Sequence, residues 1–203
     1  MKKVLLIVAA VLLASAVSAQ NHEKNILGVR AGLNLSSYSI SESGVSISTD
    51  SRASFHVAVV DQILLCDRLP FYLETGLAFS GRGGKVNGGS FRPSYLQIPV
   101  LVNYHFNIKD VVTIQPFAGL YYGFGIGGKL KANGGKADLF GDEGIFKRSD
   151  LGVRLGAGVV WNRIYFGLGY DIGCLNLAKD ALTNGGDGTM RNNCFSISVG
   201  YNF

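Results

Sequence analysis

Large apolar residues alternate with small or polar residues along the last eleven positions of the chain. The apolar set of residues 193–203 is Phe195, Ile197, Val199, Tyr201 and Phe203, and the set between them is Ser196, Ser198, Gly200 and Asn202. A period of two places these sets on opposite faces of a β-strand. A strand that is apolar on one face and ends on an aromatic residue is typical of a barrel wall that faces lipid.

The same period recurs in seven earlier segments. Together with the last segment they cover residues 27–36, 55–60, 71–82, 95–106, 112–126, 151–161, 164–173 and 193–203. Most of them are long enough for a tilted strand to cross a bilayer, which takes about 9–11 residues. The pattern therefore predicts an all-β fold, an eight-stranded antiparallel up-and-down transmembrane β-barrel.

The connections between these segments alternate in length. They are short at residues 66–70, 107–111 and 162–163, and long at residues 38–52, 83–93, 127–147 and 176–192. This alternation predicts short periplasmic turns and long extracellular loops. The aromatic residues agree, because the alternation places them in one girdle near each membrane interface.

A soluble barrel of the lipocalin type also has eight strands, and it would place the large apolar set inside. The second set of this chain is rich in glycine, which suits a crowded lumen better than a solvated surface. Mean hydropathy is +0.24 although no apolar run is long enough for a transmembrane helix. We therefore expect the large residues to face lipid.

The N-terminus has the layout of a secretory signal peptide. Lys2 and Lys3 precede an apolar run and then small residues, which predicts cleavage near Ala19, a signal peptide at residues 1–19 and a barrel domain at residues 20–203. Without Lys2 and Lys3 the formal charge falls from +5 to +3, a mild balance that predicts no nucleic-acid partner. The expected location is the outer membrane.

The inward set contains several polar residues, and one pair of them can be placed by counting. If residues 162–163 form a two-residue hairpin, Arg154 lies directly opposite Asp171. We predict an ion pair there, inside the lumen. The other lumen polar residues of the prediction are Arg30, Glu74, His105 and Gln115. A pore lining is one interpretation, and the favoured one is a structural plug, because eight strands leave room only for side chains.

Catalytic and metal chemistry find little support in the pattern. A lipid-modifying enzyme needs a nucleophile and a base within hydrogen-bond reach, and His56 with Ser80 or Ser54 at the outer rim is the pairing to consider. The spacing does not single it out, and the favoured interpretation is an interior histidine with its hydrogen bonds satisfied. Histidines and cysteines stand singly, so no metal site and no cofactor are expected. Cys174 and Cys194 bracket one loop but alternate to opposite faces, which weighs against a disulfide, and Cys66 is expected to be a free thiol.

The third long loop is basic at its start. Lys129, Lys131 and Lys136 would lie just outside the barrel, where they could contact the phosphates of lipopolysaccharide, or they belong to an ordinary solvated loop. The outer loops are also where an unknown protein partner would bind. The terminal strand ending at Phe203 is the expected contact with the barrel-assembly machinery.

Three motifs suggest a family. The segments are Tyr95-Leu96-Gln97-Ile98-Pro99, Pro116-Phe117-Ala118-Gly119 and the terminal run from Phe195 to Phe203. With them the expected mature chain resembles the PorT-like family of small outer-membrane barrels in Bacteroides-type envelopes. The resemblance implies an eight-stranded barrel without assigned chemistry. The named member of that family takes part in protein secretion, a role that no residue here carries over.

These observations predict an integral outer-membrane barrel with a side-chain-filled lumen. We expect it to act as a structural or binding module through its long extracellular loops, with membrane lipid and lipopolysaccharide as partners. The alternatives are a lipid-modifying outer-membrane enzyme and an accessory component of protein secretion.

Overall fold

The computed structural model describes residues 25–42, 45–66, 68–86, 89–109, 111–132, 135–141, 144–179 and 188–203. The expected signal peptide at residues 1–19 and its cleavage near Ala19 lie outside these residues. In the described part of the chain, no helix has the length and hydropathy needed to span a membrane.

Strands make up most of the described residues. Their bounds are β1 (Asn25–Glu42), β2 (Val45–Ser48), β3 (Asp50–Leu64), β4 (Phe71–Gly81), β5 (Gly84–Val86), β6 (Gly89–Tyr104), β7 (Phe106–Ile108), β8 (Val112–Ala132), β9 (Gly135–Asp138), β10 (Ser149–Trp161), β11 (Ile164–Gly173) and β12 (Thr189–Asn202).

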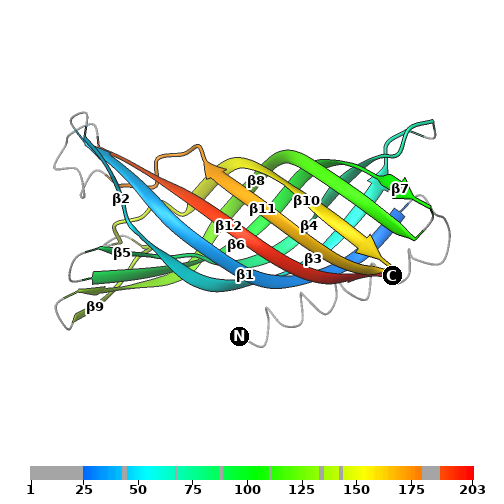
Figure 1. Cartoon of the computed structure of the whole chain (residues 1–203). Helices are drawn as coiled ribbons and strands as arrows, with labels where there is room; N and C mark the ends of the chain where they lie inside the picture. The colour runs from blue at the N-terminus through cyan, green and yellow to red at the C-terminus, as the bar shows by residue number, and fades with distance from the viewer. Residues whose placement is uncertain are drawn as a thin grey trace.

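The eight long strands close into a ring. Each pairs antiparallel with the next long strand in the order β1, β3, β4, β6, β8, β10, β11, β12, and β12 pairs again with β1. Closure pairs both edges of each long strand, as a bilayer requires. Figure 1 shows the strands tilted about the barrel axis. The predicted eight-stranded barrel is confirmed, and the short strands β2, β5, β7 and β9 extend its wall.

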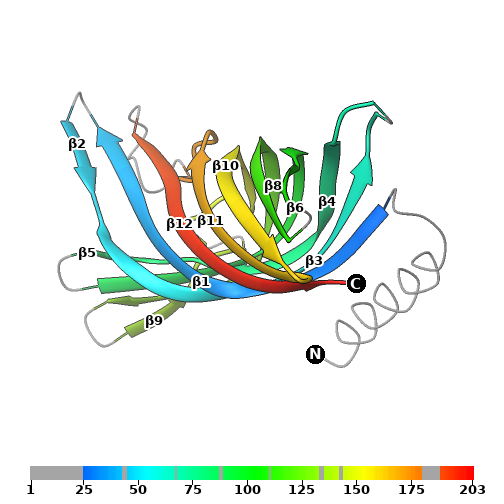
Figure 2. The ribbon, with the colours of Figure 1, turned by 45° about the vertical axis from the view of Figure 1, so that its right-hand side comes forward.

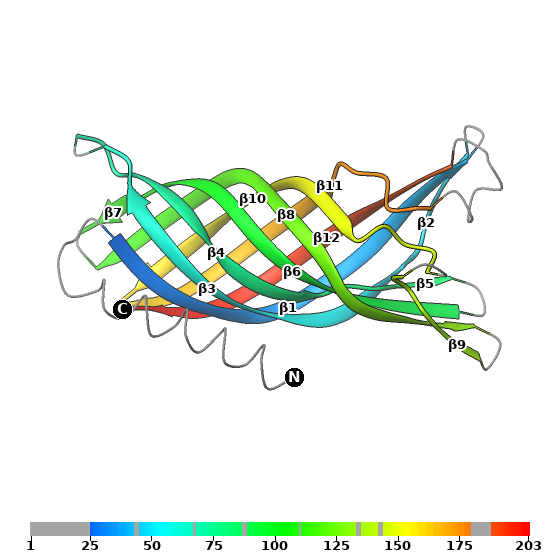
Figure 3. The ribbon, with the colours of Figure 1, turned by 180° about the vertical axis from the view of Figure 1, so that it is seen from behind.

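The two ends of the barrel differ. β7 and the C-terminus lie at one end, called here the short-turn end, and β2, β5 and β9 lie at the other, the long-loop end (Figures 1 and 3). At the long-loop end the wall divides into two extensions, one carrying β1, β2 and β12 and the other β5, β6, β8 and β9 (Figure 2). The long connections are therefore partly folded into the sheet.

The strand boundaries are a correction to those expected from the sequence. The pattern predicts loops at residues 38–52, 83–93 and 127–147, but β1 continues to Glu42 and β8 to Ala132, and β2, β5 and β9 fall inside these segments. The expected strand at 55–60 is likewise only the middle of β3, which spans 15 residues. A hairpin ladder beyond the membrane explains the difference, because its side chains no longer follow the lipid-facing pattern.

Within the middle of the barrel the large apolar residues face outward. Leu33 is 61% exposed, Leu168 53% and Ile197 48%, whereas the inward residues Gln97 and Gln115 are nearly fully buried. This arrangement is the reverse of a soluble barrel, and burying such side chains in lipid is favourable by about 25 cal/mol per Å².

The pattern inverts at the long-loop end. On β1 the outward positions change from Leu35 to Ser37 and Ser39, and the inward Tyr38 is completely buried. On β6 the outward Arg92 is exposed and the inward Phe91 is buried. A wall that leaves lipid for water needs polar residues outside and an apolar filling inside, so the inversion locates the membrane boundary.

Candidate functional site

The lumen holds a buried ion cluster, defined as Arg82, Arg154, Asp171 and Gln97. The β10–β11 register sets Arg154 opposite Asp171, and their side chains meet at 2.6 Å (Nε to Oδ1) and 2.8 Å (Nη2 to Oδ2). Arg82, which follows β4, contacts the same carboxylate from the opposite wall. Gln97 Oε1 accepts from Arg154 at 3.1 Å and from Arg82 at 3.4 Å. The cluster joins four strands or strand ends across the lumen.

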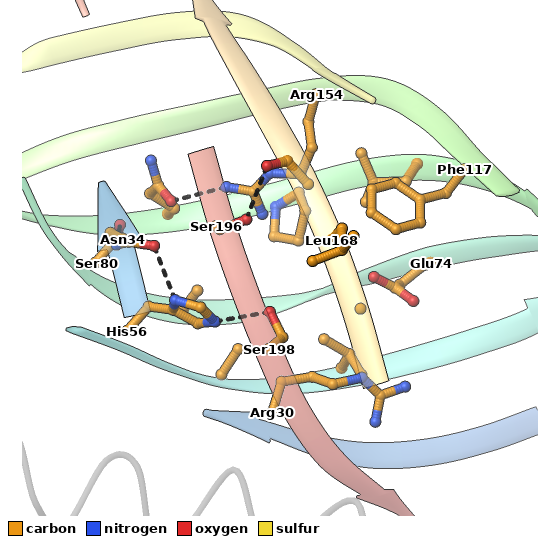
Figure 4. Close-up of a pocket in the computed structure, with 18 of the residues that line it drawn as sticks. Arg30, Asn34, His56, Glu74, Ser80, Phe117, Arg154, Leu168, Ser196 and Ser198 are labelled. Carbon is orange, nitrogen blue, oxygen red and sulfur yellow. Dashed lines mark hydrogen bonds between the residues drawn. The ribbon is translucent and has the colours of Figure 1, made fainter. Parts of the chain in front are cut away.

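A second set of hydrogen bonds surrounds His56 (Figure 4). His56 Nδ1 lies 2.8 Å from Asn34 Oδ1, and its Nε2 lies 3.0 Å from Ser198 Oγ. Asn34 Nδ2 donates to the Gly81 carbonyl at 2.9 Å. A carbonyl can only accept, so this bond turns Asn34 Oδ1 toward the ring. In the neutral ring Nδ1 therefore carries the proton, and Nε2 accepts the proton of the Ser198 hydroxyl.

Toward the short-turn end the lumen is filled by amides around Glu74. Glu74 Oε2 accepts from Gln62 at 2.6 Å and from Asn103 at 3.0 Å, and Gln62 also donates to Gln115 Oε1 at 3.4 Å. The carboxylate is thus held by hydrogen bonds rather than by an ion pair of the described residues.

The remaining predicted lumen residues stack on aromatic rings. The Arg30 guanidinium carbon lies 3.8 Å from the centroid of the Tyr165 ring, a cation–π contact. His105 stacks on Tyr72 with ring centroids 3.9 Å apart and an interplanar angle of 15°. The side chains of Arg30 and His105 are therefore packed against aromatic residues of the wall, and neither of them lines an open channel.

A small cavity remains between these groups. It lies beside His56, Ser198, Arg30 and Glu74, and the volume open to the centres of water molecules is about 70 Å³. Several waters fit, because one water needs about 10–15 Å³ by the same measure. Arg30 Nη2 is buried without a partner among the described residues, so it is a ready donor to such waters.

The long-loop end of the lumen is closed by an apolar cap. We define the cap as Tyr38, Phe91, Tyr95, Leu139, Phe140, Phe146, Leu177, Ala178 and Met190, all of them buried. Residues 139–141, 144–148 and 174–179 fold inward to supply five of these residues. Backbone bonds hold the segments: Leu139 N to Gly128 O at 3.1 Å and Leu177 N to Met190 O at 2.8 Å. The cap seals the barrel mouth against water.

Between the cap and the ion cluster lies Asp150, which is completely buried. Its Oδ2 accepts from Tyr121 Oη and from Asn192 Nδ2, each at 3.3 Å. The described lumen thus contains three arginines, Arg30, Arg82 and Arg154, and three carboxylates, Glu74, Asp150 and Asp171. Their charges balance, as a buried polar filling requires.

Several predicted residues lie elsewhere than expected. The sequence suggests a pairing of His56 with Ser80 or Ser54 at the outer rim, but His56 lies inside the lumen and contacts Ser198. Ser80 accepts instead from Asn34 at 3.0 Å, and Ser54 donates to Gly81 O at 2.6 Å. The reason is the register of β1 with its two neighbours: His56 on β3 and Ser198 on β12 both lie opposite Gly32, so the inward-pointing His56 ring reaches over this glycine to Ser198.

The three cysteines are free. Cys174 and Cys66 are exposed and Cys194 is buried, and the alternation that places Cys174 and Cys194 on opposite faces of the wall keeps them from bonding. Among the described residues, no group of three or more histidine, cysteine or acidic side chains is arranged to hold a metal ion.

The lysines of the third loop are in the wall extension. Lys129 and Lys131 are exposed on β8, and Lys131 pairs through its backbone with Lys136 on β9. The Lys136 side chain is outside the described part. Arg92 of β6 lies directly opposite Lys129. Neither Arg92 nor Arg82 is among the predicted site residues. Their partners lie on other strands, and the alternation within one strand does not show which residues of other strands lie opposite.

A family model for the outer membrane protein β-barrel domain matches residues 7–203. The solved structure of Neisserial surface protein A is similar over 87% of this chain and 97% of that chain, with a TM-score of 0.51 and 14% identity. OprG from Pseudomonas aeruginosa covers 91% and 98%, with a TM-score of 0.49 and 12% identity. Ail from Yersinia pestis covers 89% and 99%, with a TM-score of 0.46 and 13% identity. No curated protein sequence shows significant similarity.

Proposed function

The chain belongs to the outer membrane protein β-barrel domain family, and from this premise we propose that it is a closed barrel that acts as a structural or binding module at the cell surface. Its place is the outer membrane. The long-loop end is extracellular and the short-turn end is periplasmic in this proposal, as in other barrels of this kind.

The observation that carries the proposal is the closed lumen. The ion cluster crosses the middle of the barrel, amides around Glu74 fill the periplasmic half, and the apolar cap covers the extracellular mouth. A barrel that conducts would need a continuous aqueous path, and eight strands enclose only enough room for side chains. A barrel with a closed lumen can bind a partner only on its surface, and the extracellular wall extensions are exposed there.

Electrical recording tests the closed lumen. The full chain, refolded and inserted into planar bilayers, is expected to give no discrete conductance steps under conditions in which a general porin conducts. Correct insertion is checked separately, by protease protection of the chain refolded into lipid vesicles. Reproducible steps would refute the closed barrel, and the molecule would then be a channel.

The PorT-like resemblance remains part of this proposal. Its most specific motif supplies structural side chains: Tyr95 and Gln97 are buried in the lumen, and Pro99 lines the cavity. The motif therefore supports a shared way of filling the barrel more than a shared partner. A role in secretion predicts that a deletion strain loses exported proteins from its culture medium, and unchanged export would remove that alternative.

One observation favours an enzyme as second candidate. Ser198, His56 and Asn34 have the order of nucleophile, base and orienting group, with both contacts at hydrogen-bond distance. The adjoining cavity is far too small for a lipid acyl chain, so a substrate would have to be a small ester, and the amides around Glu74 would have to move apart to admit it from the periplasm. A fluorophosphonate probe that labels the folded chain, but not Ser198→Ala, would support this candidate.

A further inference from the structure

Basic side chains collect on the outer face of one wall extension. We call Lys85, Arg92, Lys129, Lys131 and Arg148 the basic strip, and all five are exposed. They come from β5, β6, β8 and the residue before β10. The pairing Arg92↔Lys129 makes one row, and the pairings Lys85↔Ser90 and Ser90↔Lys131 make the next. Paired residues share a face, so Lys85, Arg92, Lys129 and Lys131 point away from the lumen together. Arg148 lies beside them, with its Nη1 donating to Gly125 O at 2.9 Å.

The direction of the strip follows from its neighbours. Arg92 stands between Phe91 and Pro93, and both are buried. Lys129 and Lys131 stand on either side of Leu130, which packs against the cap. Because alternate residues point to opposite faces, the strip must lie on the outside of the wall.

The strip lies just above the lipid-facing belt. On β6 the outward apolar residue Leu96 precedes the boundary, and it pairs with Phe124 of β8. Arg92 is four residues before Leu96 on the same strand, toward the long-loop end. At about 3.3 Å per residue and a tilt near 40°, this separation is roughly 10 Å along the barrel axis. Arg148 is closer still, with its guanidinium carbon 5.9 Å from the Phe124 ring centroid. This is the level of lipid headgroups.

The charge of the strip is not balanced by its surroundings. Two carboxylates share its rows, Asp50 opposite Lys85 and Asp138 opposite Lys129. Within the described residues, none of the five cations forms an ion pair. In the equivalent outward positions of β1 and β12, the opposite extension has the hydroxyl and amide side chains of Ser37, Ser39, Ser41, Thr189 and Asn193. Arg191 is the one cation among these described positions. The surplus positive charge therefore faces one sector of the membrane.

We propose that the basic strip binds the phosphate groups of lipid A in the outer leaflet, with acyl chains lying on Leu96, Phe124 and Ile126. This inference rests on the proposed function and names its partner. The charges stand on the wall directly above an apolar surface, and not on loop tips, so the matching ligand is an amphiphile with phosphates at its interface. Soluble polyanions lack the apolar half of that match.

The test compares two variants with equal loss of charge. Arg92→Gln with Lys129→Gln removes one cross-strand pair of the strip. The control, Arg68→Gln with Arg191→Gln, removes an exposed cation from a periplasmic turn and one from the opposite extension. Both proteins are refolded as full chains in nonionic detergent, and heat-modifiable gel migration verifies their folding. Native mass spectrometry then measures retention of bisphosphorylated lipid A.

We expect the strip variant to bind bisphosphorylated lipid A about 25-fold more weakly, because one cation near an anionic lipid surface corresponds to about 1 kcal/mol, or fivefold. The control should bind like the parent chain, and dephosphorylated lipid A should bind all three proteins equally weakly. Unchanged affinity of the strip variant, or an equal loss in the control, would overturn the inference.

A soluble competitor separates the two sources of phosphate. Inorganic phosphate or soluble polyphosphate should fail to displace lipid A from the parent chain at matched phosphate concentration. Displacement by these ions would show that the strip binds phosphate without the lipid, and would overturn the lipid proposal. Conductance is independent of this test, so a silent barrel with an inactive strip would reject this inference and leave the closed barrel standing.

Discussion

Replacing Asp171 with asparagine tests the ion cluster most directly. The carboxylate accepts two hydrogen bonds from Arg154, at 2.6 and 2.8 Å, and a further one from Arg82. Its side chain is 3% exposed, and that of Arg82 is 1% exposed. The substitution keeps the size of the side chain and removes its charge, so both guanidinium groups lose the anion that compensates their burial.

The expected loss is about 3–5 kcal/mol in the free energy of unfolding, the usual effect of leaving a buried charge without its partner. The introduced asparagine side chain can still accept hydrogen bonds through its one oxygen, which places the value toward the lower end of that range. Asp150 is held through its Oδ2 by Tyr121 and Asn192, but its Oδ1 has no partner among the described residues and remains able to compensate Arg82 in part, which also favours the lower end. Such a loss is a large part of the stability of a domain of this size.

The single tryptophan of the chain provides the assay. Trp161 lies at the end of β10, is 54% exposed and faces lipid, so its fluorescence reports whether the wall is in the membrane. Unfolding in urea from lipid vesicles gives the midpoint and slope for the parent chain and for Asp171→Asn. Glu74→Gln is the matched control, because it makes the same carboxylate-to-amide change where the hydrogen-bond partners are amides and the nearby Arg30 stacks on Tyr165 instead of bonding the carboxylate.

The control should lose about 1 kcal/mol, the net effect of a weakened hydrogen bond. If Asp171→Asn loses no more than Glu74→Gln, the lumen is hydrated enough to solvate the arginines. The ion cluster would then not be a desolvated plug, and the argument for a closed barrel would lose its main support.

Three further predictions concern the two ends of the barrel. Phe146→Ala should lower the stability of the cap by about 3–5 kcal/mol. The result should be cleavage at residues 144–148 by an extracellular protease with unchanged Trp161 fluorescence, because the cap is at the long-loop end and Trp161 is at the short-turn end; cleavage at the parent rate would contradict it. In a Cys174→Ser background, which removes the exposed thiol of the long-loop end, a membrane-impermeant maleimide should label Cys66 only after the outer membrane is permeabilised, and labelling of Cys66 in intact cells would reverse the sidedness. Deleting Phe203, whose N–H donates to Leu27 O at 2.8 Å, should reduce the barrel in cells while leaving refolding in vesicles intact, and equal losses in both would argue against recognition by the assembly machinery.

Much of the barrel can be predicted from period and turn length alone. The two-residue connection at Asn162 and Arg163 determines the β10–β11 register, and the structure pairs Trp161 with Ile164 and Arg154 with Asp171 as that count requires. Register is determined so firmly because a slip of one residue would turn every lipid-facing side chain into the lumen.

Contacts across the lumen need information that a local pattern lacks. Arg82 and Asp171 are 89 residues apart in sequence and come from opposite walls. Their meeting depends on the tilt and stagger of all eight strands, which no single hairpin determines. His56 and Ser198 are 142 residues apart, and they meet because the β1–β3 and β1–β12 registers place both of them opposite Gly32, which depends on barrel closure. An inward direction can be read from the sequence, but the partner on the far wall cannot.

The wall extensions differ from the contacts across the lumen, because their sequence does indicate the structure. The signal is missed when only strands with apolar residues on the outward face are sought. Tyr38 and Phe91 continue the alternation of their strands, but here the inward position is the large apolar one and the outward position is Ser37 or Arg92. A search for apolar residues on the outward face therefore ends each strand where the membrane ends. A strand that goes on past that level must exchange its two faces, since water replaces lipid outside and apolar loop residues replace the polar filling inside. An inversion without a break in period is thus evidence for a longer strand and for the height of the headgroups. In the proposed binding of lipid A, the outward cations beyond it belong to the interface rather than to a solvated loop.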